Sequence, residues 1–172
     1  MVKLIVVGVG GRMGKTLVST IAQNDNFQLG AATEQEGHPV IGQDVGEIVL
    51  GEKWGIKVAA KLEQVIEQGD IIIDFTVPEA TLNHLDLACK YHKNLVIGTT
   101  GFDSAQEQKI QQAGEQIAIV KSGNMSVGVN LLLFLVKKAV KTLGENYNVE
   151  IIEAHHNLSL IHISEPTRPL YI

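Results

Sequence analysis

Short apolar runs rich in Val and Ile alternate along the chain with segments in which apolar residues recur at helical spacing. Uninterrupted runs of this kind are typical of strands buried on both faces of a parallel sheet. The runs predict strands at residues 2–7, 27–32, 56–59, 71–75, 95–97, 117–120 and 148–153. The segments between them predict helices at residues 13–23, 62–67, 78–91, 104–112 and 127–143, with a glycine-rich loop at residues 37–55. This alternation predicts an α/β fold with a doubly wound parallel sheet covered by helices on both faces.

A glycine-rich turn joins the first predicted strand to the first predicted helix, through Gly8, Val9, Gly10, Gly11, Arg12 and Met13. Glycine lets the backbone turn sharply there, and the N-terminus of a helix favours the negative charge of a pyrophosphate. Glu34 closes the second predicted strand, 20 residues beyond Gly14, where a carboxylate can accept hydrogen bonds from ribose hydroxyls. Glycine turns also occur without any ligand, but this context favours a dinucleotide-binding, Rossmann-like domain.

Three polar motifs follow later strands of the predicted sheet. They are residues 74–76 (Asp-Phe-Thr), residues 98–101 (Gly98, Thr99, Thr100 and Gly101) and residues 122–125 (Ser122, Gly123, Asn124 and Met125). The carboxyl ends of parallel strands form the ligand crevice of open α/β sheets, so the first two motifs are placed to contact the nicotinamide end of a cofactor. Each of these two fits ordinary turn chemistry equally well. The third also fits a turn between domains, with Ser126 capping the next helix.

Two adjacent histidines, His155 and His156, end the last predicted strand. Histidine can donate a proton near neutral pH, and it can hydrogen-bond a carboxylate. Neighbouring side chains of a strand point to opposite faces, so the pair is not expected to ligate one metal ion. No metal site is predicted, and a structural role for the pair is the alternative on residue chemistry alone.

The composition bears on which partners the protein binds and in which cell compartment it is found. The net charge is −5 and the Lys and Arg residues are scattered, which argues against a nucleic-acid partner. Cys89 is the only cysteine, so no intrachain disulfide can form. No apolar run reaches the length that spans a membrane, and the N-terminus lacks the features of a signal peptide. We therefore expect a cytoplasmic protein with no membrane partner.

In this order, the motifs of residues 2–157 resemble the 4-hydroxy-tetrahydrodipicolinate reductase (dihydrodipicolinate reductase) family. The shared motifs are Gly-Arg-Met-Gly, Ile-Asp-Phe-Thr, Gly-Thr-Thr-Gly-Phe, Asn-Met-Ser-Val-Gly-Val-Asn and Glu-Ala-His-His. The resemblance implies NAD(P)H-dependent reduction of 4-hydroxy-tetrahydrodipicolinate, a small-molecule substrate, in lysine and diaminopimelate biosynthesis. It also implies a dinucleotide-binding domain followed by an α+β substrate domain that builds a homotetramer.

The resemblance implies a role for each motif. Residues 8–13 would hold the pyrophosphate, and Glu34 would hold the adenosine ribose. Residues 98–100 and 122–125 would line the nicotinamide side. His155 would act as the catalytic acid or base, and His156 would bind the substrate.

One departure from the family pattern bears on the choice of cofactor. Many members carry an arginine directly after the ribose-binding acid, where it can pair with the 2′-phosphate of NADPH. This chain has the uncharged Gln35 there, and Glu34 would repel a phosphate. We therefore expect NADH to be preferred, with NADPH possible through Arg12 and Lys15.

The resemblance ends after the histidine pair. The family pattern continues with a catalytic lysine and a Gly-Thr pair that grips a substrate carboxylate, whereas residues 158–169 have no clear period and resemble translated sequencing-library adapter. We therefore expect a dinucleotide-binding domain at residues 1–126, the start of a truncated substrate domain at residues 127–157, and a non-native tail at residues 158–172. Such a chain should be inactive. Two alternatives stay open: an aspartate- or homoserine-type dehydrogenase, and a non-catalytic dinucleotide-binding regulatory module.

Overall fold

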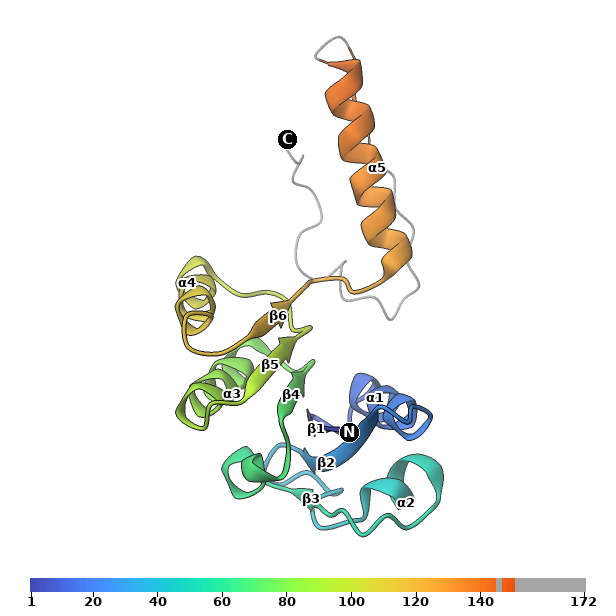
Figure 1. The fold of residues 1–172 in the computed structure, drawn as a ribbon, viewed down its shortest axis with the longest axis vertical. Helices are drawn as coiled ribbons and strands as arrows, with labels where there is room; N and C mark the ends of the chain where they lie inside the picture. Colours follow the sequence, from blue (N-terminus) through green and yellow to red (C-terminus); the bar gives the residue numbers. More distant parts are fainter. Residues whose placement is uncertain (145–146, 151–172) are drawn as a thin grey trace. The chain divides into compact units, whose positions relative to one another are not determined.

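The computed structural model describes residues 1–144 and 147–150, and these divide into two compact units after Gly123 (Figure 1). The first unit holds every strand and four of the α-helices of the described chain. The second unit begins at Asn124 and contributes one long helix.

The first unit is built on a six-stranded sheet in which every neighbouring pair of strands is parallel. The strand order is β3-β2-β1-β4-β5-β6. This order reverses next to β1, and in open α/β sheets the ligand crevice opens at that reversal, beyond the carboxyl ends of the strands. The predicted Rossmann-like fold is therefore confirmed. The strands are β1 (Val2–Val7), β2 (Phe27–Thr33), β3 (Val58–Ala59), β4 (Ile71–Asp74), β5 (Asn94–Ile97) and β6 (Ile119–Lys121).

Helices cover both faces of this sheet, α1 and α2 on one face and α3 and α4 on the other (Figure 1). The alternation of side chains along β1 explains the two layers: Leu4 and Val6 pack in the core cluster with α1 and α2, whereas Ile5 and Val7 pack in the cluster with α3 and α4. The helices are α1 (Arg12–Ala22), α2 (Val45–Leu50), α3 (Pro78–Lys90) and α4 (Ser104–Ala113).

Local sequence signals set where three of these helices begin. Pro78 occupies the first turn of α3, where its missing N–H has no helical partner to lose. Asp103 forms a capping box with Gln106 at the start of α4, because each side chain accepts a hydrogen bond from the other residue's backbone amide. Asp44 caps α2, where its Oδ1 accepts from the amides of Gly46 and Glu47.

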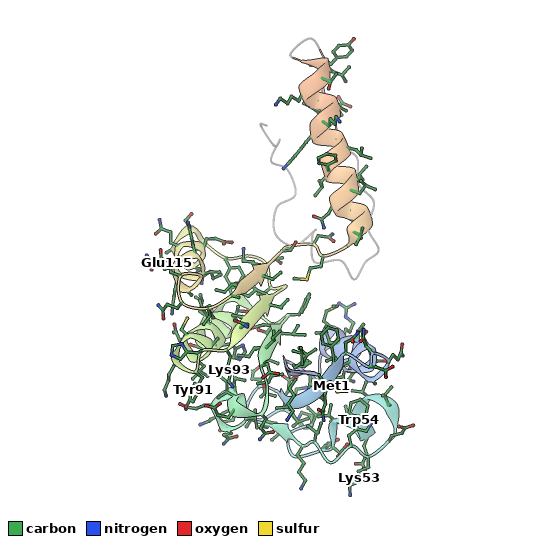
Figure 2. The ribbon with its side chains drawn as sticks, in the orientation of Figure 1. Met1, Lys53, Trp54, Tyr91, Lys93 and Glu115 are labelled. Carbon is green, nitrogen blue, oxygen red and sulfur yellow. The ribbon has the colours of Figure 1, made fainter. Side chains whose placement is uncertain are left out.

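The structure corrects the sequence prediction in three places. The expected loop at residues 37–55 contains the helix α2, which begins after its cap residue Asp44. The Trp54 side chain packs against this helix at Gly46 (Figure 2). The expected helix at residues 62–67 is a pair of single 3₁₀ turns, η1 (Leu62–Gln64) and η2 (Ile66–Gln68). Residues 148–150 of the last expected strand are not in a strand, and residues 151–153 lie outside the described chain.

The second unit consists of the 17-residue helix α5 (Val127–Leu143) and its capping turn. Ser126 caps the helix by accepting a hydrogen bond from the Val129 amide at 3.4 Å, as the sequence predicted. Asn124 shapes the turn before it, because its Oδ1 accepts from the Ser126 amide at 2.8 Å. Within the described residues, no helix combines the length and apolarity needed to cross a membrane.

Candidate functional site

The glycine turn after β1 brings the chain directly into the first turn of α1. Gly8 has a φ of 70°, in the left-handed region that favours glycine, and the Gly11 amide donates to the Gly8 carbonyl at 3.1 Å. A Cβ at Gly14 would collide with the Gly8 carbonyl and with Cα of Val9, so the close packing of α1 on this turn requires glycine. The turn therefore lies directly beside the N-terminus of a helix, where an anion is favoured.

Glu34, the residue after β2, lies against this turn. Its Oε2 accepts a hydrogen bond from the Gly10 amide at 2.7 Å, and its Oε1 accepts from the Gln35 amide at 2.8 Å. Two backbone amides thus fix the orientation of the carboxylate. Each oxygen keeps a further lone pair, so the carboxylate can also accept hydrogen bonds from a ligand hydroxyl.

A cleft of about 660 Å³ opens beside Glu34, along the carboxyl ends of β1, β2 and β4. Its charged and titratable lining consists of Glu34, Glu79, His38 and His84, and none of the described residues that line it is Lys or Arg. The remaining lining residues are Gly8, Gly10, Gly11, Thr33, Gln35, Ala60, Leu62, Phe75, Thr76, Val77, Ala80 and Asn83. The cleft therefore offers acidic acceptors and imidazoles, with apolar surface between them.

The buried carboxylate of Asp74, at the end of β4, is the centre of a hydrogen-bond network next to this cleft. Its side chain is 0% exposed, and its Oδ2 lies 2.7 Å from Nδ1 of His84 on α3. Its Oδ1 accepts from the Thr76 amide at 2.9 Å and from the Thr76 hydroxyl at 2.6 Å. Burial alone would raise the pKa of Asp74, but hydrogen bonds from His84 and Thr76 outweigh burial and hold the pKa below its ordinary value.

Thr99 connects this network to the loop after β5. Its hydroxyl accepts from the Thr76 amide at 3.0 Å and from the Thr81 hydroxyl at 2.9 Å, and it donates to Oδ1 of Asp74 at 3.3 Å. Because the residue is only 5% exposed and its hydroxyl is fully engaged, Thr99 anchors its loop to the core. Next to it, a Cβ at Gly98 would enter the ring of Phe75, so the two predicted motifs 74–76 and 98–101 pack directly together.

The structure places the predicted site residues in several groups. Gly8, Gly10, Gly11 and Glu34 line the cleft, whereas Val9 is buried in the core. Arg12 begins α1 and the Met13 side chain is exposed. In the first unit, Gly123 lies beside Thr100, since a Cβ on Gly123 would be 3.6 Å from Cγ2 of Thr100. The Ser122 amide donates a hydrogen bond to the Ile97 carbonyl at 3.1 Å. Asn124 and Met125 belong to the second unit, and His155 and His156 lie outside the described residues.

Sequence reasoning did not single out His38 or His84, although both line the cleft. His84 comes ten residues after Asp74, and only the turn between β4 and α3 brings the two side chains together. His38 lies in the segment predicted as an undifferentiated loop. One signal in the sequence could have found it: His38 lies only four residues after Glu34, the residue expected to hold the ribose.

Comparison with known proteins supports the fold and a family. The family model described as "Dihydrodipicolinate reductase, N-terminus" matches residues 2–125. The dipicolinate-bound dihydrodipicolinate reductase from Paenisporosarcina sp. TG-14 is similar with a TM-score of 0.67 and 24% identity, over 81% of this chain and 53% of that one. The chain thus spans about half the length of that reductase.

Two other solved structures share the architecture. The aspartate semialdehyde dehydrogenase with NADP from Candida albicans has a TM-score of 0.53 and 13% identity, over 70% of this chain and 42% of that one. The amine dehydrogenase from Mycobacterium smegmatis has a TM-score of 0.50 and 23% identity, over 57% of this chain and 29% of that one. At these identities the likeness concerns the fold alone.

Proposed function

We propose a specific reductase function on the premise that the chain belongs to the dihydrodipicolinate reductase family. The family and the Rossmann-like sheet imply a nicotinamide dinucleotide cofactor. The proposal is that the first unit binds NADH for the reduction of 4-hydroxy-tetrahydrodipicolinate to tetrahydrodipicolinate. One observation carries it: the Gly8–Gly14 turn opens at the N-terminus of α1 with the Glu34 carboxylate held against it.

The residues present fit the diphosphate and ribose of the cofactor. The turn has no side chain at Gly10 or Gly11, and its amides lie beside the positive end of the α1 dipole. The pyrophosphate would lie on this turn and the adenosine ribose against Glu34. The cleft between Glu34 and α3 would then take the adenine, because its lining by Ala60, Leu62 and Val77 offers apolar surface to a flat ring.

The nicotinamide end would lie along the loop that Thr99 anchors. Gly98, Thr99 and Thr100 would form the loop beside it, and the hydrogen bonds of the Thr99 hydroxyl with Asp74, Thr76 and Thr81 hold this loop in place. The bound cofactor supplies the hydride, and the protein supplies placement and electrostatics. His155 would act as the acid or base that transfers the proton accompanying reduction of the substrate, and His156 would bind the substrate.

NADH is the cofactor that this site favours over NADPH. Glu34 is fixed beside the position of the ribose hydroxyls, so its negative charge would oppose a 2′-phosphate. Gln35 adds no charge, and the described residues that line the cleft include no Lys or Arg. NADPH binding would depend on Arg12 or Lys15 at the start of α1. The substrate is a small molecule, and we propose that the complete protein is a cytoplasmic homotetramer, as the family resemblance implies.

Turnover by a completed chain tests the proposal. Residues 1–126 would be joined to the substrate domain of the Paenisporosarcina reductase and supplied with NADH and freshly generated 4-hydroxy-tetrahydrodipicolinate. We expect the reduced-nicotinamide absorbance to fall only when the substrate is present. A folded chimera that binds NADH without turning over this substrate would contradict the reductase proposal and favour a non-catalytic dinucleotide-binding module.

A further inference from the structure

We propose that His38 reads the 2′-hydroxyl of the adenosine ribose and, with Glu34, selects NADH over NADPH. The inference rests on the proposed cofactor site and adds a specificity-determining residue to it. It begins from the position of His38, which follows β2 and lines the cleft together with Glu34 and Gly10.

The protonation of the imidazole follows from a hydrogen bond on its outer side. Nδ1 of His38 accepts from the Val40 amide at 3.3 Å. An uncharged imidazole carries one proton, so accepting at Nδ1 places that proton on Nε2. His38 therefore presents an N–H donor at Nε2, and the Val40 amide determines which nitrogen carries the proton.

The donor edge of the ring lies over the glycine turn. A Cβ on Gly10 would be 2.8 Å from Cε1 and 3.2 Å from Nε2 of His38, and 2.9 Å from Oε2 of Glu34. The imidazole donor and the carboxylate acceptor thus approach the same point beside Gly10. Glycine at this position lets both side chains approach the turn this closely, because a Cβ would collide with them.

A hydroxyl and a phosphate respond differently to such a pair. A ribose hydroxyl can donate to Glu34 and accept from His38 at the same time, so both groups of the pair are satisfied. A 2′-phosphate accepts only, and it would bring negative charge against the Glu34 carboxylate. The described cleft lining contains no Lys or Arg that would offset this repulsion. The pair therefore recognises a hydroxyl and disfavours a phosphate.

Two substitutions separate this role from a structural one. In His38→Gln, the amide nitrogen can take the place of Nε2, so the donor toward the ribose is kept. In His38→Asn, the shorter side chain places its amide near the position of Nδ1, so it can keep the hydrogen bond with the Val40 amide but does not reach the ribose. His92→Asn serves as the matched control, because His92 is exposed in the turn after α3 and does not line the cleft.

The test is the affinity of the 172-residue chain and these variants for three probes: NADH, NADH with a 2′-deoxyadenosine, and NADPH. We expect the preference for NADH over the deoxy compound to be about fivefold larger in the wild type and His38→Gln than in His38→Asn, the factor typical of one neutral hydrogen bond. His38→Asn keeps only the hydrogen bond from the hydroxyl to Glu34, so it should show a smaller preference for NADH over the deoxy compound and discriminate less against NADPH, while His92→Asn should match the wild type.

Three results would overturn the inference. An undiminished preference for NADH over the deoxy compound in His38→Asn would show that His38 does not touch the 2′-hydroxyl. Equal loss of all three probes in His38→Asn and His38→Gln, with both variants folded, would show a structural role alone. Failure of the wild type to bind any of the probes would instead refute the proposed cofactor site, and the inference with it.

Discussion

Replacing the buried carboxylate Asp74 by alanine should destabilise the protein strongly. Asp74 is 0% exposed and accepts from His84, from the amide and hydroxyl of Thr76, and from the Thr99 hydroxyl. Removing the acceptor leaves these donors buried beside a small cavity. A buried donor left without a partner costs about 1–3 kcal/mol, and four donors lose their acceptor here. Because these contributions overlap in one network and do not add fully, we expect Asp74→Ala to lower the free energy of unfolding by about 3–5 kcal/mol.

Urea unfolding followed by circular dichroism measures this loss. Asp74→Asn keeps the shape and one acceptor oxygen, so it should lose only about 1–2 kcal/mol. The control is Asp86→Ala, which removes an exposed ion pair with Lys109 at 2.7 Å and should lose at most about 1 kcal/mol. If Asp74→Ala proves no more destabilising than Asp86→Ala, the network does not stabilise the fold as described.

The same carboxylate predicts a dependence of stability on pH. Hydrogen bonds from His84 and Thr76 hold the pKa of folded Asp74 below its ordinary value of 3.8 in spite of burial, so the unfolded chain takes up the proton more readily. This contribution to stability is therefore complete above about pH 4 and is lost as the pH falls through the lower pKa of the folded state. As the pH is lowered from about 4 toward the pKa of folded Asp74, the free energy of unfolding should fall more steeply in the wild type than in Asp74→Asn.

Two further predictions concern the packing of α1 and the cap of α2. In Gly14→Ala, the new Cβ would collide with the Gly8 carbonyl, so α1 must shift; thermal unfolding should show a loss of about 1–3 kcal/mol, and an unchanged melting temperature would contradict the packing. The Asp44 carboxylate accepts hydrogen bonds from four backbone amides, and the one from the Trp54 amide contributes most to lowering the pKa of Asp44. Asp44→Ala should therefore lower the melting temperature at neutral pH, and this difference from the wild type should shrink in acid, where the carboxylate is protonated.

The fold was predictable because its strands carry a strong local signal. The apolar runs of β1 and β4 are continuous because both faces of a central parallel strand are buried, and their short length and β-branched Val and Ile favour a strand over a helix. The helix α2 was missed for the opposite reason. It is a six-residue helix between glycines, too short for periodicity to register, and it depends on the Asp44 cap and on Trp54 packing over Gly46.

The candidate site was predictable only where it is continuous in sequence. The glycine turn and Glu34 are recognised by spacing, because a strand–turn–helix unit fixes their geometry locally. The contact between Asp74 and His84 and the inward-facing Thr99 hydroxyl depend on how β4, β5 and α3 pack, which spacing does not encode. Similarly, no pattern in the sequence indicates that the ring of His38 lies over Gly10.

Direct binding of NADH tests the central claim, that the glycine turn and Glu34 form a dinucleotide site. The measurement is a fluorescence titration of NADH with the chain, competed by ADP-ribose, in the wild type and in Gly11→Val. Gly11 is exposed and has a φ of −74°, which any residue can adopt, so the variant should fold while its side chain covers the turn. We predict saturable, competed binding by the wild type and a loss of at least about tenfold in affinity for Gly11→Val. Absence of binding by the folded wild type, or equal binding by the folded variant, would contradict the claim.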